Sequence, residues 1–434
     1  MIVVFDLLNL PGVIPIDLRT DNQGITIIAN VSDIDLPHCT ECQIAFHRHG
    51  RRTNIFTDTP MQMQPVRLEI SRPRYRCQGC GKIVTPELGF LDERRRSTKR
   101  LVDAVRARCL GMTFHALAEQ TGLAVNTIKN IAHDLIEQLD KTVVYETPII
   151  MGIDELMLAG DYRCVITNLA TNNVFDMLEF RTQEYMKPFF KDLPDREKVE
   201  WVCTDMWRPF KQSFKEYLPN AKLIIDKFHV VKMVSDALDD ERKKYQVTLT
   251  KDERLHVKKS IRWLTLKRPS SLSKEEIVAL EFVRQTIPDL AHAYDVKEAF
   301  FRIYDATSKD AAMQLFSEWE KDLPVKELDK FHGLARTVHN HFDDIFAYWD
   351  SPSQITNAYT ECLNGLIKVS NRMGRGYSYE IIRAKTLYAK HARKVGSGVR
   401  PSLEGIPTSS VLQMIEYGPH IPTLLKSSES GELD

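Results

Sequence analysis

The spacing of apolar residues changes several times along the chain and divides it into regions. Residues 1–95 are rich in β-branched residues and contain short strand-like runs such as Val66–Ile70. Residues 96–142 instead place apolar side chains near every third or fourth position, which is the period of a helix with one buried face. The pattern therefore predicts a β-rich domain at residues 1–95 and a helical domain at residues 96–142.

Residues 148–226 carry the pattern of a largely buried sheet. Five runs predict strands, at Ile149–Ile153, Tyr162–Leu169, Val174–Phe180, Glu200–Cys203 and Lys222–Ile225. Several runs lack the alternation of a half-exposed strand, as expected of a sheet covered on both faces. Helical stretches follow the third and fourth runs, so this region predicts an α/β layout.

The rest of the chain is mainly helical in pattern. Residues 227–356 predict an all-helical region, in which Trp263 is expected to pack into the core, with stacking on an unpaired base as the alternative. Residues 357–395 predict two helices around a glycine-containing break, and residues 396–434 form a polar tail. The expected fold class is therefore multidomain α+β.

Charge is balanced over the whole chain but not along it. Lys and Arg together number 59, as do Asp and Glu. Residues 43–108 nevertheless hold 15 basic and 6 acidic residues, and residues 368–394 hold 8 basic residues and one acidic residue. Such local excesses are typical of a protein with a DNA-facing side, although two solvated basic faces would give the same counts.

No segment has the pattern of a signal peptide or a membrane span. The apolar stretch Met1–Leu18 contains two aspartates and has no basic lead-in, and no run of about 18 apolar residues occurs. Four of the eight cysteines form two Cys-x-x-Cys pairs and the others are scattered, which fits a reducing compartment. We expect a cytoplasmic protein with no membrane partner.

The two cysteine pairs predict a zinc site. Cys39 and Cys42 form one pair, Cys77 and Cys80 the other, and 34 residues separate the pairs. Zn²⁺ prefers four thiolate or imidazole ligands in a tetrahedron, and two such pairs supply them. We predict a zinc ribbon with one structural zinc ion and no open coordination position. Unmetallated cysteines in a small β core are the alternative.

The surroundings of the cysteine pairs are basic. His47 and His49 are near enough in sequence to replace one cysteine ligand. The folded ribbon is expected to present five arginines to DNA phosphates: Arg48, Arg51, Arg52, Arg72 and Arg74.

Residues 113–131 have the spacing of a helix-turn-helix. Apolar side chains fit a core shared by two helices: Phe114, Leu117, Ala118, Leu123 and Ile128. Gly122 allows the sharp turn, and the second helix, opening at Val125, would lie in the major groove. Its predicted DNA contacts are Asn126, Thr127, Lys129 and Asn130. An ordinary helical hairpin is the alternative.

Three acidic residues predict a divalent-metal site. Asp154 and Asp205 each follow an apolar run, and carboxylates at the ends of neighbouring parallel strands converge at one sheet edge. Hard oxygen ligands there suit Mg²⁺ or Mn²⁺, and Glu361 from a later helix would complete a two-metal site. Taken singly, a strand-end Asp is more often a turn former or a helix cap.

The predicted helix that carries Glu361 has a polar face. Asn357, Glu361, Asn364 and Lys368 are spaced by four, three and four residues, so they share one side of the helix. Such a stripe suits a metal ion and a phosphate backbone.

Four short motifs together resemble the ISL-three group of bacterial insertion-sequence transposases, which use an Asp-Asp-Glu (DDE) active site. They are Gly152–Glu155, Thr204–Phe210, Ile225–Val230 and Thr360–Lys368. The cysteine pairs and the helix-turn-helix also resemble that group, over residues 35–395 in all. The resemblance implies a ribonuclease-H-like core, residues 148–226 and 357–395, interrupted by a helical insertion at residues 227–356.

The resemblance also implies roles for single residues. Asp154, Asp205 and Glu361 would be the catalytic triad, holding two Mg²⁺ or Mn²⁺ ions per active site. Glu155 and Asp226 leave open which carboxylates touch metal. Asp226 and His229 could support the active site, or Asp226 could cap the next helix with His229 packed beneath it.

Basic residues around the break between the last two helices are candidates for phosphate contacts. Arg372 and Arg375 flank the glycines, and three further basic residues follow: Arg383, Lys390 and Arg393. A solvated basic helix is the alternative.

The function expected is that of a DNA transposase, associated with the nucleoid when bound. It would bind double-stranded DNA at the terminal inverted repeats of an insertion sequence, as a homodimer because two ends must be held together. The alternatives are a DNA-binding regulator with a decayed core, against which all three acids count, and a ribonuclease-H-like nuclease that cuts without joining.

Overall fold

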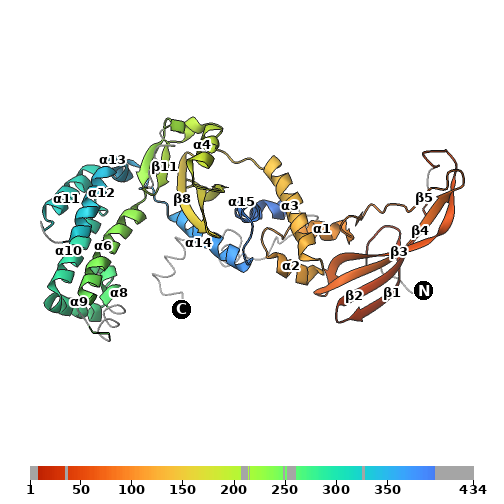
Figure 1. Cartoon of the computed structure of the whole chain (residues 1–434), viewed down its shortest axis with the longest axis horizontal. Helices are drawn as coiled ribbons and strands as arrows, with labels where there is room; N and C mark the ends of the chain where they lie inside the picture. Colours follow the sequence, from red (N-terminus) through yellow and green to blue (C-terminus); the bar gives the residue numbers. More distant parts are fainter. Residues whose placement is uncertain are drawn as a thin grey trace, which may run out of the picture.

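The computed structural model describes residues 8–34, 38–206, 214, 216–247, 250–251, 261–324 and 328–395, with the backbone alone for residues 390–395. Figure 1 shows an elongated molecule, with a β-sheet at one end, a helical region at the other and a second sheet between them. The predicted tail, residues 396–434, lies outside the described residues.

The N-terminal sheet has seven strands in the order β1-β2-β4-β3-β7-β6, with β5 beside β4. The strands are β1 Val13–Asp21, β2 Gly24–Val31, β3 Phe46–Met61, β4 Gln64–Cys77, β5 Ile83–Val84, β6 Leu91–Asp92 and β7 Ser97–Thr98. Alternate residues of β4 (Val66, Leu68 and Ile70) are fully buried, because successive side chains of a strand point to opposite faces. The strands β3 and β4 have 16 and 14 residues, and the predicted run Val66–Ile70 lies inside β4.

Three helices follow the sheet: α1 Lys99–Arg106, α2 Phe114–Thr121 and α3 Val125–Thr142. The Thr98 hydroxyl accepts a hydrogen bond from the Leu101 amide and so caps α1. The buried faces of these helices share one apolar core with α15 Tyr379–Val395, the last helix in the described part of the chain. Arg95, just before α1, forms ion pairs with Asp92 and with Asp134 of α3, which attaches the sheet to the helices.

The central sheet has the strand order β10-β9-β8-β11-β12. Its strands are β8 Ile150–Leu158, β9 Asp161–Asn168, β10 Asn173–Leu178, β11 Trp201–Thr204 and β12 Lys222–Ile225. Strand β9 runs antiparallel to both of its neighbours, β8 and β10, whereas β11 runs parallel to both β8 and β12. All five predicted strands are confirmed, and α4 Gln183–Lys191 and the 3₁₀ turn η1 Arg196–Lys198 connect β10 to β11.

The described parts of residues 227–356 are helical, as predicted. The elements are α6 Lys227–Val247, α8 Arg262–Leu266, η3 Pro269–Ser271, α9 Lys274–Thr286, α10 Pro288–Ile303, α11 Lys309–Lys321, α12 Asp329–Asn340, α13 Phe342–Phe346 and η4 Ala347–Asp350. Their core includes Phe300, Trp319 and Phe331. The expectation that Trp263 packs into this core was wrong: its side chain is 65% exposed, because α8 has only five residues and buries Leu264 and Thr265 instead.

The chain then returns to the central sheet. Helix α14, Ala358–Met373, lies against β8 and β9, and α15 joins the core of the helices α1–α3 (Figure 1). The ammonium group of Lys385 on α15 is buried and donates hydrogen bonds to the carbonyl oxygens of Cys109, Leu110 and Met112. Helix α15 therefore attaches the N-terminal helices to the central sheet.

Candidate active site and DNA-reading motif

Three aspartates form a row across the parallel strands of the central sheet. The register pairs Trp201 with both Ile150 and Lys222, so four residues further along Asp205 comes level with Asp154 and Asp226. Neighbouring strands lie about 4.8 Å apart, which brings the three carboxylates to one edge. Asp154 was expected after the end of its strand, but β8 continues to Leu158 because it pairs with β9 on its other side.

Helix α14 brings Glu361 to the same edge. The backbone N–H of Asn357 donates a hydrogen bond to Asp226 Oδ1 (2.9 Å), and the Asn357 side-chain amide donates one to the backbone carbonyl of Ile153 (3.0 Å). Thr360, one residue before Glu361, shares a hydrogen bond of 2.7 Å with Thr167 of β9. These buried polar contacts fix the first turn of α14, and Glu361 with it, over β8 and β9.

A glycine in β8 makes the close approach of α14 possible. A Cβ atom on Gly152 would lie 2.5 Å from Asn357 Oδ1, 2.5 Å from Thr167 Oγ1 and 2.6 Å from Thr360 Oγ1. Contacts this short are essentially never seen for a Cβ atom. The first turn of α14 can therefore sit against β8 only where the strand has no side chain.

We predict that Gly152→Ala displaces α14. Overpacking of this kind costs about 1–3 kcal/mol of folding free energy, and any activity that depends on Glu361 should fall because that residue moves with the helix. Denaturant unfolding measures the first effect, and an assay of that activity measures the second. The matched control is Gly365→Ala on α14, where an added Cβ meets no atom within 4 Å. Equal behaviour of the two variants would contradict this account of how the helix is seated.

The acidic side chains of this edge perturb one another. Burial raises the pKa of Asp154 to about 6, opposed by the His229 ring and reinforced by the charges of Asp205 and Asp226. Burial likewise raises the pKa of Glu361 to about 7, and Asp226 and Asp154 add to that shift while His229 opposes it. Burial disfavours protonation of His229, but the aspartates around it, Asp226 first, outweigh burial and raise its pKa. Crowded, partly buried carboxylates favour binding of a cation.

One buried carboxylate oxygen at this edge lacks a hydrogen bond. Asp226 is fully buried, and its Oδ2 has no hydrogen-bond donor within the described part of the chain. It faces His229 Nδ1 at 3.5 Å, and that nitrogen lies 4.0 Å from Glu361 Oε1. Ligand atoms of Asp226, His229 and Glu361 all lie within 4.8 Å of one another, so the residues present fit a metal ion. This set shares Glu361 with the predicted triad but differs from it in the other two members.

The neighbouring candidates divide into residues near the edge and residues away from it. Asn364 donates a hydrogen bond of 2.8 Å to Asp154 Oδ2, so it orients that carboxylate. Glu155 forms an ion pair with Arg181 and lies on the opposite face of β8 from Asp154. The side chain of Lys368 is exposed and makes no hydrogen bond or ion pair within the described residues, so the polar face of α14 mainly attaches the helix to the sheet.

The four paired cysteines converge beside the ends of β3 and β4. Their sulfur atoms lie within 4.8 Å of one another, with Cys39–Cys80 at 3.6 Å and Cys42–Cys77 at 3.2 Å. Neither His47 nor His49 belongs to the group that the described residues form. Backbone amides, that of Cys80 first, point to the Cys77 thiol and lower its pKa to about 6. The donor set, four sulfurs with one thiol held toward its thiolate form, suits zinc.

The helix-turn-helix has the predicted form. Gly122 ends α2 in the left-handed conformation (φ 73°), and α3 begins at Val125. Leu117 and Ile128 are fully buried between the two helices. On the other side of α3, Asn126, Lys129 and Asn130 are exposed and Thr127 is partly exposed. These four side chains are therefore accessible to a ligand.

Comparisons with known proteins find matches for both the central region and the helix-turn-helix. A family model described as a transposase matches residues 151–386, more than half of the chain, and a model of the helix-turn-helix domain of transposase family ISL3 matches residues 86–136. The chain belongs to transposase family ISL3. A curated relative of this transposase is the transposase for insertion sequence element IS1001 of Bordetella parapertussis, 22% identical over 365 residues, which are 82% of this chain and 89% of the relative.

The basic residues near the end of α14 and on α15 differ in whether their side chains are ion-paired within the transposase. Arg372, in the last turn of α14, and Arg375, between α14 and α15, are both exposed. Arg383 was expected to track phosphates, but it is bonded to Asp140 and Asp176 within the protein. The side chains of Lys390 and Arg393 lie outside the described residues.

Near the cysteines, three of the five arginines expected to face phosphates are bonded within the protein. Arg48 and Arg51 pair with Asp33, and Arg72 is buried against Glu93. Arg72 is therefore not presented on the surface, whereas contact of Arg48 and Arg51 with phosphates stays a prediction. Arg52 and Arg74 have no such partner in the described part of the chain.

Sequence reasoning missed the residues that seat α14. Thr167, Thr360 and Gly152 carry no charge and do not belong to a recognised ligand set. The available signal was Gly152 inside an apolar strand, since a strand-interior glycine often marks a close approach of another backbone.

No helix in the described ranges combines the length and the apolar character needed to cross a membrane.

Proposed function

We propose that this transposase binds the terminal inverted repeats of its insertion sequence, cleaves the DNA ends and joins them to target DNA. The observation that carries the proposal is the row of Asp154, Asp205 and Asp226 across three parallel strands, with Glu361 held over it by α14. The transposase family and its helix-turn-helix domain support action on DNA.

We further propose that residues 148–226 and 357–395 form one ribonuclease-H-like core. Three antiparallel strands followed by two parallel ones, in the order β10-β9-β8-β11-β12, support this assignment. Residues 227–356 would then be a helical insertion between the last strand and the helix that bears Glu361. Residues 1–95 and 96–142 would be the zinc-containing and helix-turn-helix domains.

In the proposed reaction, Asp154, Asp205 and Glu361 hold two divalent ions, Mg²⁺ or Mn²⁺. When bound, such ions activate water or a 3′-hydroxyl and stabilise the leaving oxygen. Asn364 keeps the Asp154 carboxylate oriented through its 2.8 Å hydrogen bond. Asp226 fixes the start of α14 through the Asn357 amide, and His229 lies between Asp226 and Glu361, where it can donate to a phosphate oxygen.

The other proposed partners are one structural zinc ion on the four cysteines and double-stranded DNA. We propose that the transposase acts as a homodimer on DNA, because two element ends must be brought together for joining. Sedimentation of the protein with and without end DNA measures this: a two-to-two complex is expected, and one chain per pair of ends would contradict it.

An assay of end cleavage tests the proposed function. A labelled duplex that spans the junction between the element and flanking DNA should be bound and then nicked at the junction in Mg²⁺. Binding without cleavage by the unaltered chain would favour a DNA-binding regulator. Cleavage without preference for the junction would favour a general nuclease.

We predict that Lys129→Ala and Asn130→Ala relax discrimination between the element end and unrelated DNA. Base-edge contacts are worth about 1–3 kcal/mol each, so affinity for the end should fall by about ten- to a hundredfold while affinity for unrelated DNA changes little. Competition binding with the two duplexes measures this.

The comparison variant is Arg372→Ala/Arg375→Ala. Both side chains are exposed at the C-terminal end of α14, and phosphate contacts are blind to sequence, so affinity should fall for both duplexes. Equal losses on both duplexes for the Lys129 and Asn130 variants would place recognition elsewhere, in the N-terminal sheet or the helical region.

A further inference from the structure

A cavity in the N-terminal sheet is lined mainly by guanidinium groups. Its volume is about 190 Å³, several times the roughly 30 Å³ of a water molecule in the liquid, so a phosphate group fits. It is lined by Arg52, Asn54, Ile55, Phe56, Arg72, Glu93 and Arg96. Three arginines and one glutamate leave a positive excess of two charges on the walls.

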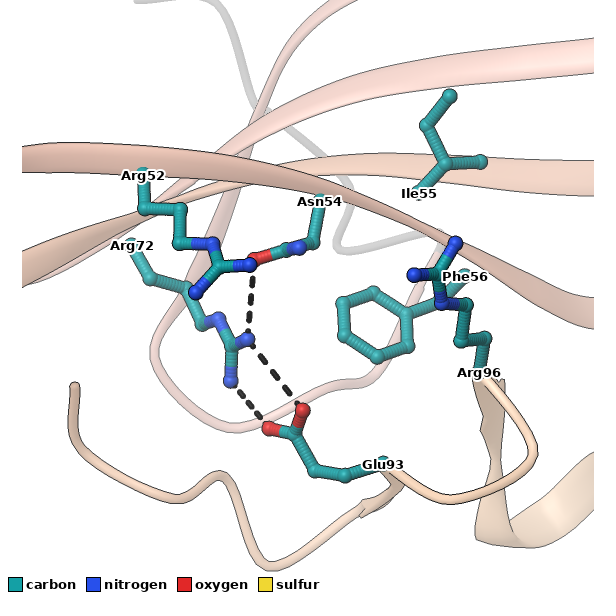
Figure 2. A pocket seen from close by; sticks show the side chains of 7 residues that line it. All are labelled: Arg52, Asn54, Ile55, Phe56, Arg72, Glu93 and Arg96. Atoms are coloured by element: carbon teal, nitrogen blue, oxygen red, sulfur yellow. Dashed lines mark hydrogen bonds and ion pairs between the residues drawn. The ribbon is translucent and has the colours of Figure 1, made fainter.

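Figure 2 shows how these side chains meet. Arg52, Asn54 and Phe56 project from β3 and Arg72 from β4, while Glu93 and Arg96 come from the loop that covers this end of the sheet. The register pairs Arg52 with Arg72 across the two strands, so both side chains are on the same face.

Arg72 is a fixed part of the cavity wall. It is only 5% exposed, pairs with Glu93, donates to Asn54 Oδ1 at 3.1 Å and stands over the Phe56 ring at 5.4 Å. Its Nε is buried and has no hydrogen-bond acceptor among the described residues. The carboxylate of Glu93 offsets one guanidinium only, which leaves the cavity positive.

The other two arginines are available to a ligand. Arg52 and Arg96 are exposed, and neither makes a hydrogen bond or an ion pair through its side chain within the described ranges. The backbone nevertheless holds Arg96 in place: its φ is 49°, and its carbonyl accepts a hydrogen bond of 2.9 Å from the Thr57 amide. Two like charges beside one cavity repel each other, and an anion between them relieves that repulsion.

The position of the loop indicates which anion. Arg95, next to Arg96, is ion-paired with Asp134 of α3. Asp134 lies four residues after Asn130, so it shares the helical face on which the predicted base contacts lie. A DNA duplex held by α3 would therefore pass its sugar–phosphate backbone beside this loop.

We propose that Arg52 and Arg96, with Arg72 behind them, form a subsite for a single DNA backbone phosphate next to the sequence that α3 reads. This site rests on the proposed binding of element ends but not on the proposed chemistry. Two guanidinium groups that converge on one phosphate fix the register of the DNA on the protein without reading its sequence.

The test is end binding by Arg52→Gln/Arg96→Gln at several salt concentrations. Loss of a charged hydrogen-bonded contact should weaken binding by about ten- to a hundredfold. Because both side chains serve one phosphate, the slope of log K against log salt should fall by about 0.9. The control of equal charge loss is Arg19→Gln/Arg67→Gln, on exposed side chains of the same sheet that do not line the cavity. It should bind nearly as the unaltered chain does.

A methylphosphonate scan of the DNA locates the contact. One neutral linkage should weaken binding by the unaltered protein and have no further effect on the double variant. Arg52→Lys/Arg96→Lys, which keeps both charges, should retain most of the affinity, and thermal melting checks that every variant is folded.

Three results would overturn the proposal. One is a folded double variant that binds DNA as the control does. Another is a slope change of about 1.8, which means two separate phosphates. The third is loss of inorganic phosphate binding, measured by calorimetry, with DNA affinity unchanged, which means a site for the free anion. By contrast, an unaltered protein that binds element ends but never cleaves them would contradict the proposed chemistry and leave this subsite standing.

Discussion

Glu361→Gln should abolish cleavage of element ends while leaving binding of those ends within a few fold. The carboxylate lies 4.0 Å from His229 and beside the row of aspartates, where it would hold a divalent ion. Metal ions contribute several kcal/mol to such reactions, and each 1.36 kcal/mol is tenfold in rate, so the loss should be about a thousandfold or more. Single-turnover cleavage of a labelled end measures it, and Asp154→Asn and Asp205→Asn should behave in the same way.

The matched control is Glu155→Gln. Glu155 is adjacent to Asp154 in sequence but is ion-paired with Arg181 on the opposite face of β8. This variant should cleave within a few fold of the unaltered chain. Near-normal cleavage by Glu361→Gln, or abolition by Glu155→Gln, would mean that a different set of acids holds the metal ions.

Removal of zinc should unfold the cysteine-bearing end of the N-terminal sheet. Structural zinc sites contribute about 10–16 kcal/mol of apparent binding free energy, and a missing ligand forfeits much of it. Cys77→Ser should therefore reduce the zinc content from one ion per chain to nearly none. It should also weaken end binding by at least about tenfold, since the sheet is fastened to α3 through Arg95 and Asp134.

Elemental analysis and end binding measure the two effects. The control is Cys362→Ser, because Cys362 lies on α14 away from the four clustered thiols and should leave the zinc content unchanged. A purified, folded chain without zinc, or a Cys77→Ser chain that retains it, would contradict the assignment.

Sequence reasoning was most successful where a local pattern determines local structure. The five strands of the central sheet, the turn at Gly122 and the start of α3 at Val125 follow from hydrophobic period and turn chemistry, and all are confirmed. The convergence of the four cysteines also follows from spacing, because two Cys-x-x-Cys turns can share one set of four ligand positions.

Features that depend on distant parts of the chain could not be predicted. Asp154 lies inside β8 rather than after it because the partner strand β9 extends the pairing. Arg72 is buried against Glu93 because the loop that carries Glu93 folds back over the sheet. Trp263 is exposed because a helix of five residues buries its other side. Each of these outcomes depends on a tertiary contact, which the local spacing of hydrophobic residues does not reveal.

The acids of the candidate site were named from the sequence and their roles stay a prediction, whereas the contacts that hold them together could not be foreseen. The register that aligns Asp226 with Asp154 and Asp205 appears only when the three strands are paired. The role of Gly152, which is to leave room for Asn357 and Thr360, likewise becomes visible only when α14 is packed against β8.

A strand-transfer assay tests the central claim most directly. Labelled element ends with a free 3′-hydroxyl are incubated with the transposase, Mg²⁺ and a target plasmid, and in parallel with ends that carry a 3′-deoxy terminus. The account predicts covalent joining of the 3′-hydroxyl ends to the plasmid, none for the 3′-deoxy ends, and none with Glu361→Gln. Ends that are bound and cut but never joined to the plasmid by the unaltered protein would contradict it.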